Sequence, residues 1–86
     1  MNNFAAAMLA VELVDRRDTL RRLLGPSYSE RTKTAQTLIQ SIVNRTGKPI
    51  LNVAQELCVM AMKDGHEEVV NTLVAAAVDL CEASAS

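Results

Sequence analysis

The glycines and prolines of this chain stand only at three breaks, which divide it into four segments. The breaks are Gly25-Pro26, Gly47-Lys48-Pro49 and Asp64-Gly65. Glycine accepts the left-handed conformation that ends a helix, and proline cannot continue one. Because no glycine or proline falls inside a segment, each segment can form one uninterrupted element.

The apolar residues between the breaks recur with the three- and four-residue spacing of helices. The clearest one-sided stripe lies in the second segment and consists of Ala35, Leu38, Ile39, Ile42 and Val43. Strands are not indicated, because alternating runs bounded by hairpin turns are missing. We therefore predict helices over residues 4–24, 28–45, 49–63 and 65–82, with 83–86 as a frayed tail.

Local signals also predict where these helices begin. Ser27 with Glu30 fits a capping box, and Asp64 with Glu67 forms a similar pair. Pro49 suits the first position of a helix, where its missing N–H costs nothing.

Short connections between helices make successive helices antiparallel. With 86 residues, the chain is long enough for one small domain. The sequence thus predicts an all-α fold, a small antiparallel bundle of four helices, or a close variant, joined by short Gly/Pro turns. The third helix is apolar around nearly its whole circumference, which is typical of a central helix or of one with a face left for a partner.

Features of membrane and secreted proteins are missing from the sequence. No stretch approaches the roughly 20 apolar residues of a membrane span, and Met1-Asn2-Asn3 lacks the basic start of a secretory signal. We expect a cytoplasmic protein without membrane contact.

The two cysteines, Cys58 and Cys81, are too few for a disulfide scaffold. In a hairpin turning near residue 64 their heights differ by roughly 15 Å, too far for a bridge within one chain. We interpret them as small buried residues, and the alternative is a bridge between chains or a reactive thiol.

The residues that carry chemistry do not form a catalytic or metal-binding pattern. His66 is the single histidine, and with two cysteines it falls short of the about four ligands of a structural zinc site. The isolated glycines do not make a phosphate-binding loop, and no nucleophile stands beside a base in a recognisable pattern. We predict no enzyme, no metal and no cofactor.

The charges are divided unevenly along the chain. Residues 1–49 hold eight Lys and Arg against four Asp and Glu, a net +4, whereas residues 50–86 hold one against six, a net −5. One interpretation is a solvated surface of paired charges, including Glu12–Arg16 and Asp18–Arg22 four residues apart on one helix. In another, the basic half of one subunit meets the acidic half of a second copy.

A third interpretation is a basic face that docks an acidic protein or phosphates, formed by Arg17, Arg21, Arg22, Arg31 and Lys33. Recognition of base edges is poorly supported, because the third helix begins with apolar and then acidic residues. Stacking on bases is excluded by the scarcity of aromatic side chains, which are Phe4 and Tyr28 alone.

The third helix carries the best candidates for an adhesive surface. This helix has more apolar residues than three neighbouring helices are expected to cover. The residues expected to stay exposed are Val59, Met60 and Met62, and methionine side chains adapt well to partners. We expect these residues to form an oligomer interface. The sequence therefore favours a non-enzymatic interaction module, an adaptor, inhibitor or regulator of another protein of unknown identity, acting as a homo-oligomer, most simply a homodimer. The alternative is a small nucleic-acid-associated regulator that contacts phosphates through the basic face.

Overall fold

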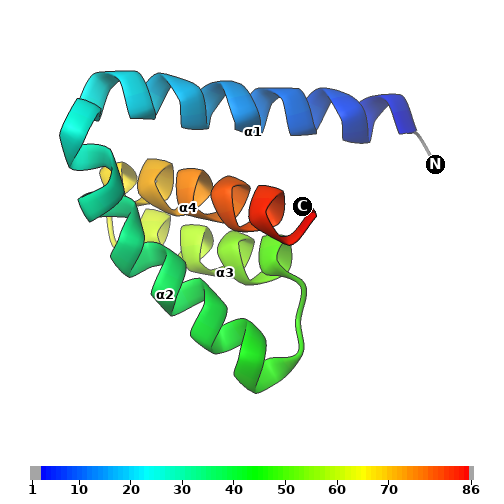
Figure 1. Cartoon of the computed structure of the whole chain (residues 1–86). Coiled ribbons are helices and arrows are strands. Elements are labelled where there is room, and N and C mark those ends of the chain that lie inside the picture. Colours follow the sequence, from blue (N-terminus) through cyan, green and yellow to red (C-terminus); the bar gives the residue numbers. More distant parts are fainter. Residues whose placement is uncertain (1–2, 86) are drawn as a thin grey trace.

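The computed structural model describes the backbone of residues 3–85 and the side chains of residues 8–84. Its elements are α1 (Asn3–Leu24), the 3₁₀ turn η1 (Gly25–Ser27), α2 (Tyr28–Thr46), α3 (Ile50–Lys63) and α4 (Glu67–Ala85), as shown in Figure 1. The predicted all-α fold with four helices is confirmed.

The helix boundaries differ from the predicted ones by at most three residues. Helix α3 begins at Ile50 because Pro49 stands just outside it with an extended backbone, and the Pro49 carbonyl accepts the Val53 N–H at 3.1 Å. Helix α4 begins at Glu67 and continues to Ala85. The predicted frayed tail is therefore wrong for residues 83–85, since alanine is the strongest helix former; Ser86 lies outside the described residues.

The three predicted breaks end the helices as expected. Gly25, Gly47 and Gly65 each have a positive φ, of 56°, 75° and 77°. The capping box predicted at Ser27 is wrong: its side chain makes no capping hydrogen bond. The preceding 3₁₀ turn holds Ser27 in a helical conformation (φ −76°, ψ −11°), whereas a capping residue needs an extended one.

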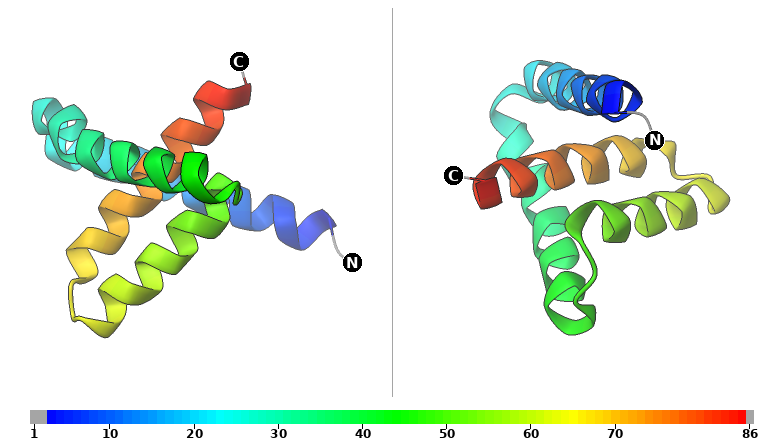
Figure 2. Two further views of the ribbon diagram at one scale, coloured as in Figure 1. Left: turned by 90° about the horizontal axis from the view of Figure 1, so that it is seen from below. Right: turned by 90° about the vertical axis from the view of Figure 1, so that its right-hand side faces the viewer.

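Helix α4 occupies the centre of the molecule. It pairs antiparallel with α3 and also packs against α1 and α2, while α1 scarcely touches α2 (Figure 2). Three consecutive alanines, Ala75, Ala76 and Ala77, are buried together. Because alanine side chains are short, helices can approach α4 closely from several directions. The centre of the bundle is thus α4, and α3 is the helix with a face left over.

The core joins α2, α3 and α4. Its fully buried members include Ile39 of α2, Val53 of α3 and Leu73 of α4. Helix α1 contributes no residue to this cluster of the described side chains. Instead, α1 crosses α4 from the outside, and its N-terminal half projects beyond the other helices (Figures 1 and 2).

Candidate interaction surface

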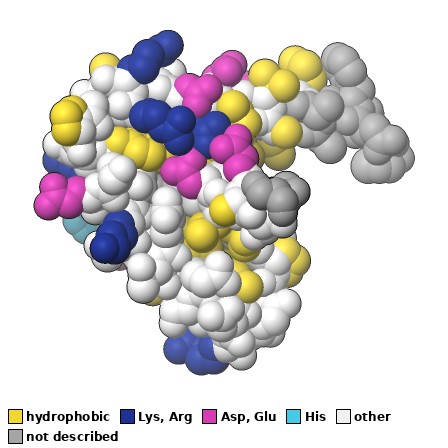
Figure 3. Space-filling model, in the orientation of Figure 1, with side chains coloured by type: hydrophobic (Ala, Val, Ile, Leu, Met, Phe, Trp, Pro, Cys, Tyr) yellow, Lys and Arg dark blue, Asp and Glu magenta, His cyan; other side chains and the backbone are white. Residues whose placement is uncertain are grey.

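Large apolar side chains lie exposed on two of the four helices in particular. Within the described side chains, five large apolar residues are buried, and ten are exposed by 40% or more. Seven of those ten lie on the projecting half of α1 and on α3: Met8, Leu9, Val11, Leu51, Val59, Met60 and Met62. Figure 3 shows hydrophobic side chains along the projecting part of α1. Among the described side chains, the exposed large apolar residues thus outnumber the buried ones, while others, such as Ile42, Leu57 and Leu80, are partly buried against the core.

The three residues predicted as an oligomer interface are all exposed, but they do not share one face. Val59 and Met62 are three residues apart and therefore neighbours on the outer side of α3. Met60 is turned by about 100° from Val59 and about 160° from Met62. Leu51 is three turns before Met62 and lies on the same side of α3. The exposed apolar face of α3 therefore consists of Leu51, Val59 and Met62, and Met60 does not belong to it.

An apolar groove separates α1 from the α3–α4 hairpin. It has a volume of about 370 Å³. Leu9, Leu13 and Arg16 of α1 form one wall, and the opposite wall includes Leu51 of α3 and Val74 of α4. The sequence alone did not reveal this groove, because it arises only where α1 crosses the hairpin.

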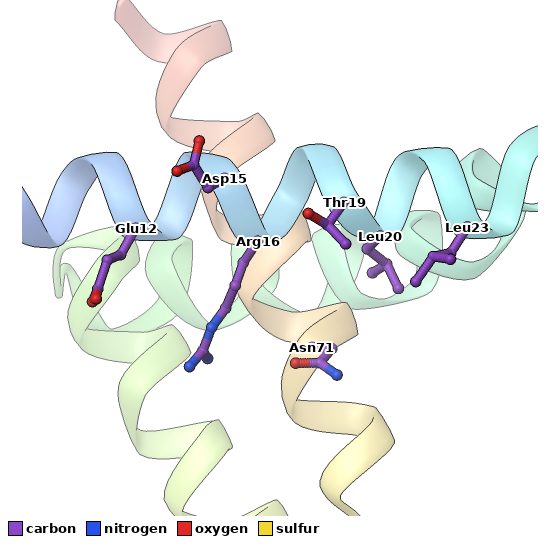
Figure 4. Close-up of a pocket in the computed structure, with 7 residues that line it drawn as sticks. All are labelled: Glu12, Asp15, Arg16, Thr19, Leu20, Leu23 and Asn71. Atoms are coloured by element: carbon purple, nitrogen blue, oxygen red, sulfur yellow. The ribbon is translucent and has the colours of Figure 1, made fainter.

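A second hollow of about 440 Å³ continues along the same flank of α1. Figure 4 shows that Glu12, Arg16, Leu20 and Leu23 point to the same side of the helix. Arg16 lines both hollows, so the apolar groove and the second hollow meet at its side chain.

Arg17 does not belong to an exposed basic face. It is only 5% exposed. Its guanidinium donates to Asp79 at 2.6 Å, to both carboxylate oxygens of Glu82 at 2.7 and 2.9 Å, and to Asp18 at 2.7 Å. The hydrogen bonds to these carboxylates raise the pKa of Arg17, and Arg17 in turn lowers the pKa of Glu82. The prediction that Arg17 meets a partner is corrected accordingly: it fastens α1 to α4.

Tyr28 and Arg21 complete this charged cluster. The Tyr28 hydroxyl donates to the second oxygen of Asp79 at 2.6 Å, and Arg21 lies 3.3 Å from the first. The Arg21 guanidinium also stacks over the Tyr28 ring, 5.1 Å from its centre. Burial and the bond to Asp79 raise the pKa of Tyr28 to about 12. Figure 3 shows basic and acidic side chains side by side where α1 crosses α4.

The other predicted basic residues are exposed and point in different directions. Arg21 and Lys33 line one shallow polar hollow, with Asp79 in its lining. Arg22 donates to Thr19 at 3.4 Å. Arg31 and Lys33 are two residues apart on α2, which places them on opposite flanks of that helix. The structure therefore brings Arg21 and Lys33 together and separates them from Arg22 and Arg31.

The two oppositely charged halves of the sequence meet within one chain. Arg17 and Arg21 bind Asp79, Arg17 also binds Glu82, and Lys48 binds Glu56 at 3.0 Å. Each of these pairs joins a basic residue of the first half to an acidic one of the second. The predicted pairs Glu12–Arg16 and Asp18–Arg22 are wrong: neither forms in the described part of the chain, and Asp18 binds Arg17 instead.

The remaining chemistry-bearing residues lie apart. Cys58 and Cys81 are free and half-buried, and burial raises the pKa of both thiols. His66 is exposed, 3.9 Å from Glu68. Among the described residues, no three or more His, Cys, Asp and Glu side chains are grouped as a metal site would require.

Comparisons with protein families, with characterised proteins and with solved structures find no match to this chain. In the described part of the chain, none of the helices combines the length and the apolar character needed to cross a membrane.

Proposed function

We propose that this chain is a non-enzymatic protein–protein interaction module of the cytoplasm, a small adaptor, inhibitor or regulator that binds another protein and acts as a homo-oligomer. The observation that carries the proposal is the set of exposed large apolar side chains gathered on α1 and α3. On small proteins such surface marks contact with other proteins. The methionines on it, Met8, Met60 and Met62, adapt to partners of different shape.

The exposed basic residues support a protein partner better than a nucleic acid. Arg31 and Lys33 lie on opposite flanks of α2, and Asp79 lies beside Arg21. A phosphate backbone is best bound by a continuous stripe of positive charge. At the rim of a protein interface, in contrast, scattered basic side chains serve to orient an acidic partner.

The test is affinity capture from the source cells with three forms of the chain. The wild type is compared with Val59→Ser/Met62→Ser, and the control is Leu38→Ser on α2. Leu38 and Val59 are both 46% exposed, so the control shows whether loss of one such apolar side chain from another face alters capture by itself. We expect at least one protein that the wild type and the control retain and the α3 variant loses. Capture of the same proteins by all three forms contradicts the proposal.

A second measurement separates this function from phosphate binding. Titration with duplex DNA at low salt detects phosphate contacts, whose affinity falls steeply as salt is raised. We expect no binding at low salt. DNA binding that is lost on Arg31→Glu/Lys33→Glu, and unaffected by Val59→Ser/Met62→Ser, favours the nucleic-acid alternative instead.

A further inference from the structure

We propose that the groove beside α1 receives α1 of a second copy of this chain, in antiparallel orientation, so that two chains form a two-fold dimer. The inference rests on the proposed function, since it identifies a second copy as one protein that the exposed apolar surface binds. It also places the contact on α1 and on the groove wall that includes Leu51, away from Val59 and Met62 of α3.

The flank of α1 that lines the groove is complementary to itself. Along the helix it presents Leu9, Glu12, Leu13, Arg16 and Leu20, and Figure 4 shows Glu12, Arg16 and Leu20 on one side. Leucines thus stand at both ends, with an acid and a base one turn apart between them. About a centre at residue 14, Glu12 and Arg16 exchange places and Leu20 falls beside Met8 and Leu9, whereas the position opposite Leu13 is Asp15.

A two-fold axis near residue 14 therefore matches opposite charges twice. Glu12 of one chain then faces Arg16 of the second copy, and Arg16 faces Glu12, as two-fold symmetry requires. Neither residue takes part in an ion pair among the described residues. Leu9, which is exposed, comes to lie close to the half-buried Leu20 of the second copy, and this contact removes Leu9 from water.

The space beside α1 accommodates a helix. The hollows of about 370 and 440 Å³ lie end to end at Arg16. Together they follow the flank from Leu9 to Leu23, a length of roughly 20 Å at 1.5 Å per residue. The floor and far wall include Leu51 and Val74, so an incoming helix meets apolar side chains on the hairpin as well as on α1.

A second copy fits this groove better than an unrelated helix does. An unrelated helix needs to carry both charges in the matching order, whereas a second copy carries them by symmetry. The dimer also covers apolar residues on the projecting half of α1, of which Leu9 is 56% exposed. A chain of 86 residues has a small core, and oligomerisation is a common way of stabilising such chains.

The test reverses the charges at Glu12 and Arg16, first one at a time and then both together. In the homodimer, Glu12→Arg places two arginines opposite each other at each pair, and Arg16→Glu places two glutamates there. We expect each variant to raise the dimer Kd about tenfold at low ionic strength, because two attractive pairs become repulsive. The double variant Glu12→Arg/Arg16→Glu restores both pairs and returns the Kd to near the wild-type value.

Mixing the two single variants separates contacts between chains from contacts within one. Each single variant carries two like charges four residues apart on its own α1. The repulsion between them within one chain is the same before and after mixing. Between the two different chains, however, both pairs become attractive. Native mass spectrometry at equal concentrations is expected to show an excess of heterodimer, meaning clearly more than the half of all dimers that random pairing gives. Leu9→Ser is expected to weaken the dimer, and Leu38→Ser to leave it unchanged.

The possible results either support or overturn the inference. An excess of heterodimer, with weakened single variants, supports it. A wild type that stays at the monomer mass of 9.3 kDa throughout a dilution series overturns it, together with the homo-oligomer part of the proposed function. Capture of another protein through α3 then still supports the interaction module. A wild-type dimer without excess heterodimer in the mixture also overturns it and moves the dimer contact to another surface.

Discussion

Replacing Arg17 is expected to loosen α1 from the rest of the molecule. In Arg17→Met the side chain keeps its bulk and loses all four hydrogen bonds to carboxylates. Asp18 and Glu82 are about half exposed, with exposed fractions of 49% and 54%, so water screens their attraction to Arg17 and they add little to stability. Asp79 is only 18% exposed, so its bond to Arg17 falls in the stronger range of about 1.5–3 kcal/mol.

Together these contributions predict a loss of about 2–3 kcal/mol in the free energy of unfolding. For a chain of this length the melting temperature is then expected to fall by roughly 10–20 °C. The matched control is Arg22→Met, which removes an exposed arginine from the same helix and is expected to change stability by less than about 0.5 kcal/mol. Urea unfolding followed by circular dichroism, at equal protein concentrations, measures both.

The variants together give a clear criterion for the role of Arg17. If Arg17→Met is no more destabilising than Arg22→Met, Arg17 does not fasten α1 to α4 and the argument is refuted. A double-mutant cycle with Asp79→Asn then measures the direct coupling. We expect a coupling energy of about 1 kcal/mol or more, because the two groups are 2.6 Å apart and partly shielded from water.

Three further predictions concern other parts of the molecule. Tyr28 is the single tyrosine, so the absorbance of tyrosinate reports on it alone; its midpoint is expected near pH 12 in the folded chain and near pH 10 in urea. Because the raised pKa favours the neutral phenol, stability is full below pH 10 and falls as the pH rises toward 12; a folded midpoint near 10 contradicts this. Ala76→Leu overfills the fully buried side of α4 and is expected to lower the free energy of unfolding by about 1–3 kcal/mol. The matched control Ala83→Leu, at an exposed position, is expected to leave thermal unfolding almost unchanged. In Gly47→Ala the added Cβ contacts no neighbouring atom, but the backbone keeps a φ of 75°. The free energy of unfolding is therefore expected to fall by about 1 kcal/mol from backbone strain alone, and an unchanged urea midpoint contradicts this expectation.

The helices were predictable from the sequence because their signals are local. Glycine with proline at a break, and apolar residues spaced by three and four, act within a few neighbouring residues. The central position of α4 was harder to predict, since it depends on alanines such as Ala76, which a search for large apolar stripes undervalues. The exposure of Val59 and Met62 followed from counting more apolar residues on α3 than its neighbours could cover.

The role of Arg17 could not be predicted from local pattern. Its partners Asp79 and Glu82 are 62 and 65 residues away in the chain, and nothing in the sequence around Arg17 distinguishes it from Arg16. The decisive property is the direction of the side chain once α1 lies on α4. The groove was missed for the same reason, because its two walls come from opposite ends of the sequence.

The way in which α1 is fastened explains why one flank of it is left for another chain. An apolar anchor would turn α1 so that Leu9, Leu13 and Leu20 face α4. Instead Arg17 occupies the position that faces α4, and the clustered carboxylates hold it there. Because the leucines of the flank lie about 40–80° away around the helix, they point sideways into the groove. A charged fastening thus fixes α1 while leaving its apolar flank available, which an anchor made of those leucines could not do.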